Sequence, residues 1–174
     1  MEQHTSWETI KKMKNLVSII ILCTLSMAFS SCKRERVLSQ EYGFPDGQWS
    51  ADNHVTLTLE VPKDYVGKKF DMYLEFVHTP NIFRDMIKMD IIAVSPVDER
   101  SAEYNIYLKD VNGKFKGTPE GNFLHFSQLL RNQFVFGAAG TWSFEFIQRS
   151  ELFYFDELKS MRLVFRENAE KVKK

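Results

Sequence analysis

The sequence predicts an all-β domain, an antiparallel β-sandwich of the jelly-roll or immunoglobulin-like kind with one or two short helical turns. Three observations predict this fold. Apolar and polar residues alternate with a period of two over most of the chain from Ser50 onward. Gly and Asn occupy the turns between these stretches, and only two short segments suggest a helix. Fifteen Phe, in a chain with only 8 Gly and 5 Pro, indicate a packed core rather than disorder.

The first 31 residues are predicted to be a signal peptide. Lys14 precedes an uncharged apolar run from Leu16 to Phe29, which ends in small residues and is shorter than the roughly 20 residues that a membrane-spanning helix needs. Met13 begins a more compact signal, so residues 1–12 are either a misplaced start or an extended n-region.

Cys32 follows this run directly, after Ser30 and Ser31. Small residues before a cysteine at this place resemble the lipobox of bacterial lipoproteins. That resemblance implies that the peptide is cut before Cys32 and that its thiol is acylated, which anchors the chain because each buried methylene contributes about 0.8 kcal/mol. Ordinary secretion with an unmodified Cys32 is the alternative. We expect residues 32–49 to form the lipidated cysteine and a short linker.

Removal of residues 1–31 leaves 143 residues with 20 basic and 21 acidic side chains. A nearly neutral chain lacks the basic field of a nucleic-acid binder, so that class of partner is excluded. Cys32 is then the sole cysteine, and no internal disulfide can form.

The β-sandwich domain is predicted to cover residues 50–167, followed by a polar tail, residues 168–174. Its clearest strand alternates four apolar residues with Thr and Glu between Val55 and Val61, and Pro62 ends it. The predicted strands are residues 55–61, 70–76, 89–94, 104–108, 141–147 and 161–166. Turns are predicted at 44–47, 110–113 and 136–140, with Asn112-Gly113 as a hairpin signal, and short helical segments at 127–131 and 150–158.

The sequence contains no nucleophile elbow, His-Glu-x-x-His pair, phosphate loop or Cys-x-x-Cys motif. After processing, the three histidines His54, His78 and His125 lie too far apart in sequence for a local metal site. We therefore predict no catalytic residue, no metal, no cofactor and no enzymatic activity.

Three aromatic residues are candidate ligand or partner contacts: Trp49, Phe153 and Tyr154. Trp142 shares a strand face with two Phe and is predicted to be core. For Trp49 a core position is favoured, and an exposed ligand contact is the alternative. Residues 153–155 are all aromatic and cannot all be buried on one strand face, so part of this run is predicted to be a partner surface. An exposed platform around Trp49 or Tyr154 would suit sugar rings, so a glycan-binding lipoprotein is the alternative function.

Several segments in order resemble the GldH-type gliding-motility lipoproteins of Bacteroidota. They are Cys32, Tyr42 with Pro45–Ser50, the long β region, residues 104–117, residues 136–148 and a closing strand at 161–165. The resemblance implies a non-enzymatic accessory lipoprotein of the gliding and type IX secretion machinery, with envelope proteins as partners. Lys33, Arg34 and Arg36 make the segment after Cys32 mostly basic, which favours the periplasmic face of a membrane, with the outer membrane preferred.

Overall fold

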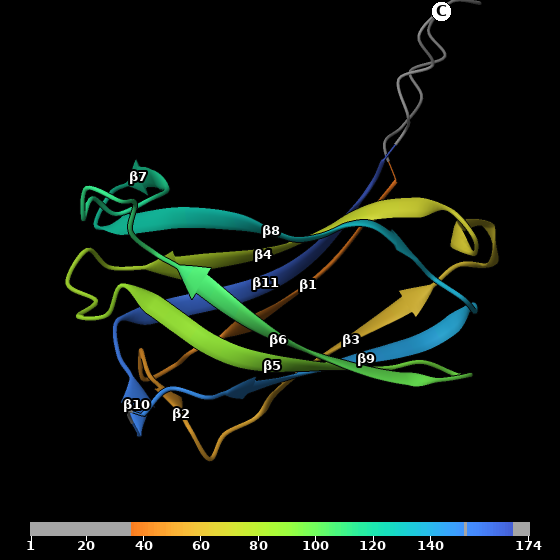
Figure 1. Ribbon diagram of the computed structural model, residues 1–174, viewed down its shortest axis with the longest axis horizontal. Helices are drawn as coiled ribbons and strands as arrows, with labels where there is room; N and C mark the ends of the chain where they lie inside the picture. Colours follow the sequence, from red (N-terminus) through yellow and green to blue (C-terminus); the bar gives the residue numbers. More distant parts are fainter. Residues whose placement is uncertain (1–35, 152, 169–174) are drawn as a thin grey trace, which may run out of the picture. The chain divides into compact units, whose positions relative to one another are not determined.

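The computed structural model describes residues 36–151 and 153–168, which form two antiparallel β-sheets packed face to face (Figure 1). The first sheet has the strand order β1-β11-β4-β8-β7 and the second β3-β9-β5-β6, while β2 and β10 form a separate two-stranded ribbon. The predicted signal peptide, Cys32 and residues 169–174 lie outside the described residues. The strands are β1 (Val37–Gly43), β2 (Trp49–Ser50), β3 (Val55–Val61), β4 (Lys69–His78), β5 (Met86–Val94), β6 (Glu99–Tyr107), β7 (Thr118–Glu120), β8 (Phe123–Val135), β9 (Gly140–Gln148), β10 (Tyr154–Phe155) and β11 (Leu158–Glu167).

The strand pairs are nested inside one another. β1 pairs with β11, β2 with β10, β3 with β9, β4 with β8 and β5 with β6, all antiparallel. The pairs β1–β11 and β4–β8 belong to the first sheet, and the pairs β3–β9 and β5–β6 belong to the second. From the outermost pair inward the pairs therefore alternate between the two sheets, as they do when one long hairpin is wound around a barrel. This order is that of a jelly roll, so of the two predicted topologies the immunoglobulin-like one is excluded.

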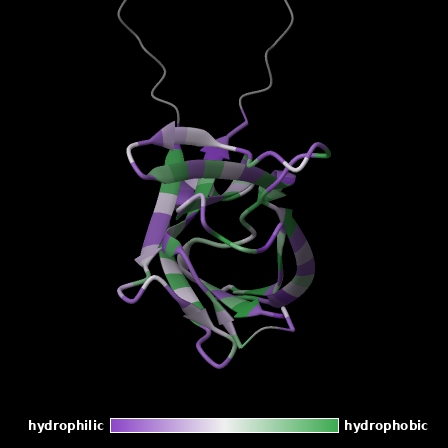
Figure 2. Cartoon of the chain, turned by 90° about the vertical axis from the view of Figure 1, so that its left-hand side faces the viewer, coloured by the Kyte–Doolittle hydropathy of each residue, from purple (hydrophilic) through white to green (hydrophobic). Residues whose placement is uncertain are grey.

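The six strands predicted from period two are confirmed, with ends shifted by up to five residues. In β3 every second side chain is buried, from Val55 to Val61, and β4 follows the same pattern from Phe70 to His78. Figure 2, which looks along the sandwich from the end that carries β2, β7 and β10, shows hydrophobic and hydrophilic residues alternating along the strands. The Asn112-Gly113 turn is also confirmed, because Gly113 has φ +75° and its N–H donates to the Asp110 carbonyl at 3.1 Å.

Three expectations about chain segments require correction. Residues 37–49 are not a linker, because β1 pairs along its whole length with β11 and β2 begins at Trp49. Residues 127–131 lie within the long strand β8, whose pairing with β4 overrides their local helical pattern. Residues 150–158 contain β10 rather than a helix, and the short helical turn among the described residues is a 3-10 helix, η2 (Lys63–Tyr65), directly after Pro62.

A cluster of aromatic rings joins the two sheets. Phe165 of β11 packs against Phe134 of β8, Phe144 of β9 and Phe136, with ring centroids 5.0, 5.4 and 4.9 Å away. Trp142 meets Phe136 edge to face at 5.1 Å, which confirms its prediction as core. Such pairs add to the hydrophobic stabilisation of burial and fix how the sheets face each other.

This cluster predicts that Phe165→Ala destabilises the domain by about 3–5 kcal/mol, because the ring is fully buried and its loss leaves a cavity between the sheets. Phe153→Ala is the matched control, since that ring is 53% exposed and its removal should change stability by less than about 0.5 kcal/mol. Urea denaturation followed by circular dichroism measures both. Equal losses in the two variants would contradict the assignment of Phe165 to the central cluster.

Candidate functional site

The predicted contact residues do not form one platform. Trp49 is completely buried, and its indole N–H donates to the Asn53 carbonyl at 2.8 Å, so it belongs to the core and offers no face to a ligand. This confirms the core position favoured for Trp49 and corrects its candidacy as a contact. Tyr154 and Phe153 are 47% and 53% exposed, whereas Phe155 is buried opposite Trp49 in the β2–β10 ribbon.

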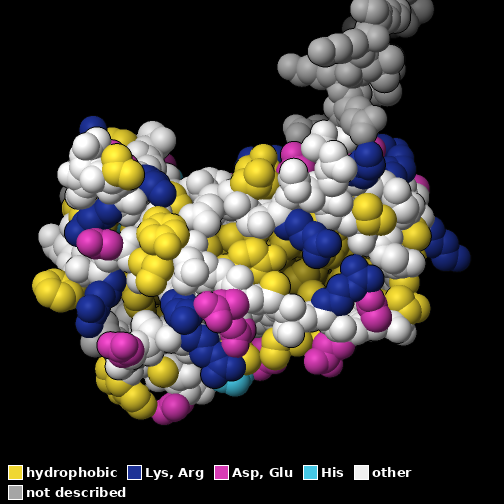
Figure 3. Space-filling model, in the orientation of Figure 1, with side chains coloured by type: hydrophobic (Ala, Val, Ile, Leu, Met, Phe, Trp, Pro, Cys, Tyr) yellow, Lys and Arg dark blue, Asp and Glu magenta, His cyan; other side chains and the backbone are white. Residues whose placement is uncertain are grey.

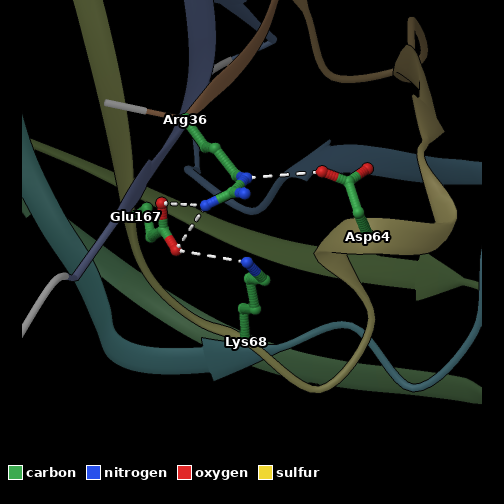
Figure 4. Close-up of polar contacts among 4 residues, drawn as sticks. All are labelled: Arg36, Asp64, Lys68 and Glu167. Atoms are coloured by element: carbon green, nitrogen blue, oxygen red, sulfur yellow. Dashed lines mark hydrogen bonds and ion pairs between the residues drawn. The ribbon is translucent and has the colours of Figure 1, made fainter. Parts of the chain in front are cut away.

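At one end of the sandwich lies an ion-pair cluster, here called the Arg36 cluster, which consists of Arg36, Asp64, Lys68 and Glu167 (Figure 4). It lies where the chain enters the domain, directly before β1. Arg36 donates two hydrogen bonds to the Glu167 carboxylate at 2.9 and 3.1 Å and one to Asp64 at 3.4 Å. Lys68 lies 3.8 Å from the same Glu167. The hydrogen bond to Glu167 is the main reason that the pKa of Arg36 is raised. Because the Glu167 N–H also donates to the Arg36 carbonyl, the described chain ends are joined by backbone and side chain.

The opposite end, the loop end, consists of residues 79–85, 107–117 and 153–157, with Tyr107 as the last residue of β6. β4 connects the two ends, since Lys69 pairs with Val135 near the Arg36 cluster and His78 precedes the first loop. Ten residues of extended chain span about 33 Å.

The first of these loops presents Phe83 to solvent on an ordered backbone. Thr79 bonds to Glu157 through both its N–H and its hydroxyl, and Ile82 is buried. Phe83 is nevertheless 87% exposed, with the Arg84 guanidinium 5.6 Å from its ring. An apolar ring held in water by a fixed loop is a feature of binding surfaces rather than of a core.

The second loop presents Val111 to solvent at the same end of the sandwich as Phe83. Asp110 accepts hydrogen bonds from the N–H groups of Asn112 and Lys114 at 2.8 and 2.9 Å, which fixes the turn, and Val111 is fully exposed. Lys109 of this loop forms an ion pair with Asp85 of the first loop at 2.5 Å. The two apolar tips therefore belong to one connected surface.

All four exposed aromatic side chains of the described residues lie at the loop end. They are Phe83, Tyr107, Phe153 and Tyr154. Around the Arg36 cluster the exposed large apolar residues are valines instead. Aromatic side chains dominate the energetics of protein interfaces, so this asymmetry marks the loop end as the candidate functional site. Sequence reasoning missed Phe83 and Val111, although each is an apolar residue in a turn-rich segment outside any alternating strand.

The outer face of the first sheet carries a shallow polar groove of about 150 Å³. Its central carboxylate, Glu75, lies between Arg162 at 2.7 Å and Arg166 at 2.8 Å. The Glu75 carboxylate is thus held by two arginines and is not an isolated acid. No group of three or more metal-ligating side chains occurs in residues 36–151 and 153–168, and within those ranges no helix is long and apolar enough to span a bilayer.

His78, at the base of the loop end, is a buried histidine. Its Nδ1 lies 2.8 Å from the Thr79 carbonyl, so this nitrogen carries the hydrogen, and Nε2 is buried without a hydrogen-bond partner. Burial lowers the pKa of His78 below its usual value, and the bond to Thr79 opposes this only in part.

With these surfaces described, the chain can be compared with known proteins. No protein-family model matches it, and no curated protein is significantly similar. Among solved structures it is similar to the crystal structure of a carbohydrate-binding module, CBM28, specific for non-crystalline cellulose. The two are 13% identical over 75% of each chain, with a TM-score of 0.42. At this level the likeness assigns no ligand.

His78 predicts a loss of stability in acid. Its pKa is lower in the folded than in the unfolded chain, so its contribution is fully present above about pH 6.5 and decreases as the pH falls below that value, by up to about 1.4 kcal/mol per pH unit. Urea midpoints between pH 7.5 and 5 measure the effect. His78→Leu should flatten the dependence, and an unchanged slope in this variant would contradict the assignment.

Proposed function

We propose that this chain is a non-enzymatic, lipid-anchored protein of the bacterial cell envelope that binds a protein partner through its loop end. The observation that carries the proposal is the gathering of the exposed aromatic side chains, led by Phe83, at the end opposite the entry of the chain. A domain whose exposed aromatic side chains gather at one end is suited to bind a partner through that end.

A lipid anchor on Cys32 would determine which end of the domain faces the membrane. Only three residues lie between Cys32 and Arg36, and the four Cα-to-Cα steps between them span at most roughly 14 Å. An acylated Cys32 would therefore hold the Arg36 cluster close to the bilayer. The loop end, about 33 Å farther along β4, can then extend toward the aqueous phase. A partner for Phe83 and Val111 is thus expected to be a protein of the envelope rather than the same bilayer.

The machinery that this protein serves is inferred from the resemblance to gliding-motility lipoproteins. That resemblance runs from Cys32 to the last strand and brings no catalytic residue with it. In the proposed role the domain is an accessory factor of gliding motility and type IX secretion on the periplasmic face of a membrane, the outer membrane being preferred. Charged side chains of both signs occur in the same loops, among them Arg84, Lys114 and Glu157. They suit the polar rim that surrounds the apolar centre of a protein interface.

Complementation tests this proposal. A strain that lacks the gene, in a host that glides or secretes by this route, should lose colony spreading and type IX export. The wild-type gene should restore both and Phe83→Ser should not, because truncating an interface centre costs about 2 kcal/mol or more of binding. Val97→Ser is the control, since Val97 is 69% exposed but lies outside the loop end. Normal spreading and export in the deletion strain would refute the proposal.

Glycan binding is a second candidate, supported by one observation. Phe153 and Tyr154 are exposed side by side, with ring centroids 4.7 Å apart. Their planes are inclined by 84°, so only one ring at a time can stack on a sugar, and the burial of Trp49 removes the wider platform.

If this second function operates, Tyr154→Ala should weaken binding of soluble glucans or peptidoglycan fragments about tenfold or more. Tyr107→Ala, which removes another half-exposed tyrosine, should leave the affinity unchanged. Isothermal titration calorimetry measures both. Absence of binding by the wild-type chain would dismiss the glycan function and leave the protein-partner proposal standing.

A further inference from the structure

A narrow slot, here called the Arg131 slot, enters the sandwich on the side where β6 and β8 are edge strands. Figure 3 shows it as a hollow of hydrophobic side chains bordered by Lys or Arg side chains. Its lining includes Ala93, Tyr104, Arg131, Phe134, Trp142 and Phe144. Its enclosed volume is about 50 Å³, and about 430 Å³ when the open mouth is included. The enclosed part holds only a few water-sized groups.

The slot exists because β8 leaves its regular path. The pairing of β8 with β4 shifts register on both sides of Met72, and Gln133 has φ +51°, which is unusual for a residue other than Gly. The Gln133 N–H donates to the Asp71 carboxylate at 3.1 Å, so this bulge is held in place. Bulges of this kind occur at sheet edges and next to binding sites, where they redirect side chains.

No other strand closes the opening. β7 pairs only with residues 123–125 of β8, and β6 pairs only with β5. As a result residues 99–103 of β6 are exposed on both faces, in contrast to the alternating burial of the strands that the opposite sheet covers. The side chains beneath the opening are nevertheless those of the core, including Trp142 and Phe144.

The floor of the slot has no free polar group. The Trp142 indole N–H already donates to the Ala138 carbonyl at 2.9 Å, and the other floor residues are apolar. Polar ligands such as sugars would leave their hydroxyls unpaired there, whereas a hydrocarbon chain would not.

The rim, by contrast, is cationic. Arg100 is held by Asp98 at 2.6 Å, but Arg131 forms no ion pair with a carboxylate in the described part of the chain. Its guanidinium lies 5.8 Å from the ring of Phe134, directly beside the floor. Tyr104 is half-buried on the same rim; burial raises the pKa of its phenol, and the charge of Arg131 opposes this rise.

We propose that the Arg131 slot binds a single-chain amphipathic anion. Its hydrocarbon chain lies in the open mouth of the slot, along Ala93 and the half-buried ring of Tyr104, since Trp142 and Phe144 beneath are almost fully buried, and its carboxylate or phosphate head accepts hydrogen bonds from Arg131. The guanidinium suits both head groups, because its planar donors match two oxygens at once. This site lies on the open side of the sandwich rather than in the loops, and it does not depend on the protein partner proposed above.

Photoaffinity labelling tests the site in the full chain. Decanoic acid that carries a diazirine on its chain should label residues of the slot, as located by mass spectrometry of the peptides that cover β5, β8 and β9. Octanoate should compete for labelling, whereas octanol, with the same chain and no charge, should compete about tenfold less well. Octyl phosphate in a parallel series shows which of the two head groups is preferred.

Two variants separate the roles of charge and space. Arg131→Gln should weaken labelling about tenfold and remove the preference for octanoate over octanol, whereas Arg149→Gln, a change at an exposed arginine away from the slot, should have no effect. Ala93→Leu should block labelling by filling the enclosed volume while Arg131 remains. Thermal unfolding verifies that each variant is folded. Labelling spread over the surface, or equal labelling of wild type and Arg131→Gln, would overturn the proposal.

Discussion

The packing of Phe165 against the rings of both sheets is the interaction on which the rest of the structure depends. Phe165 contacts Phe134 from its own sheet and Phe144 from the opposite one, so the distance between the sheets is set at this point. The same rings form the floor of the Arg131 slot. Core and candidate ligand site are therefore not independent, because any change that loosens the ring cluster also alters the slot.

The two ends of the sandwich have different physical characters. Around Arg36 and Glu167 the surface is organised by charge, and these contacts join the first and last strands. At the loop end it is organised by exposed aromatic rings on loops that are fixed by hydrogen bonds. Surface ion pairs contribute little to stability, so the first arrangement serves mainly to orient the strand that leads toward Cys32. Exposed aromatic rings contribute less to folding than buried ones, and their gathering at one end points to an interaction.

Strands such as β3 and β4 were predictable because one face of each is buried on the core and the other faces solvent. β1 was not, since it is an edge strand held by backbone pairing with β11, and few of its side chains are buried. Local pattern favoured a core position for Trp49 but could not identify its pairing partner, because Phe155 is distant in the sequence. The Arg131 slot arises from a bulge in β8 against β4, a feature of long-range register that no short sequence window contains.

The nested pairing also constrains when the domain can fold. β11 is the last strand of the chain, yet it lies in the interior of its sheet, between β1 and β4. A growing chain that still lacks this strand leaves β1 with no neighbour to pair with. Such long-range closure makes folding slow relative to helical domains. The first sheet can therefore close only when β11 is available, and until then the edge of β4 that faces β1 stays open as well.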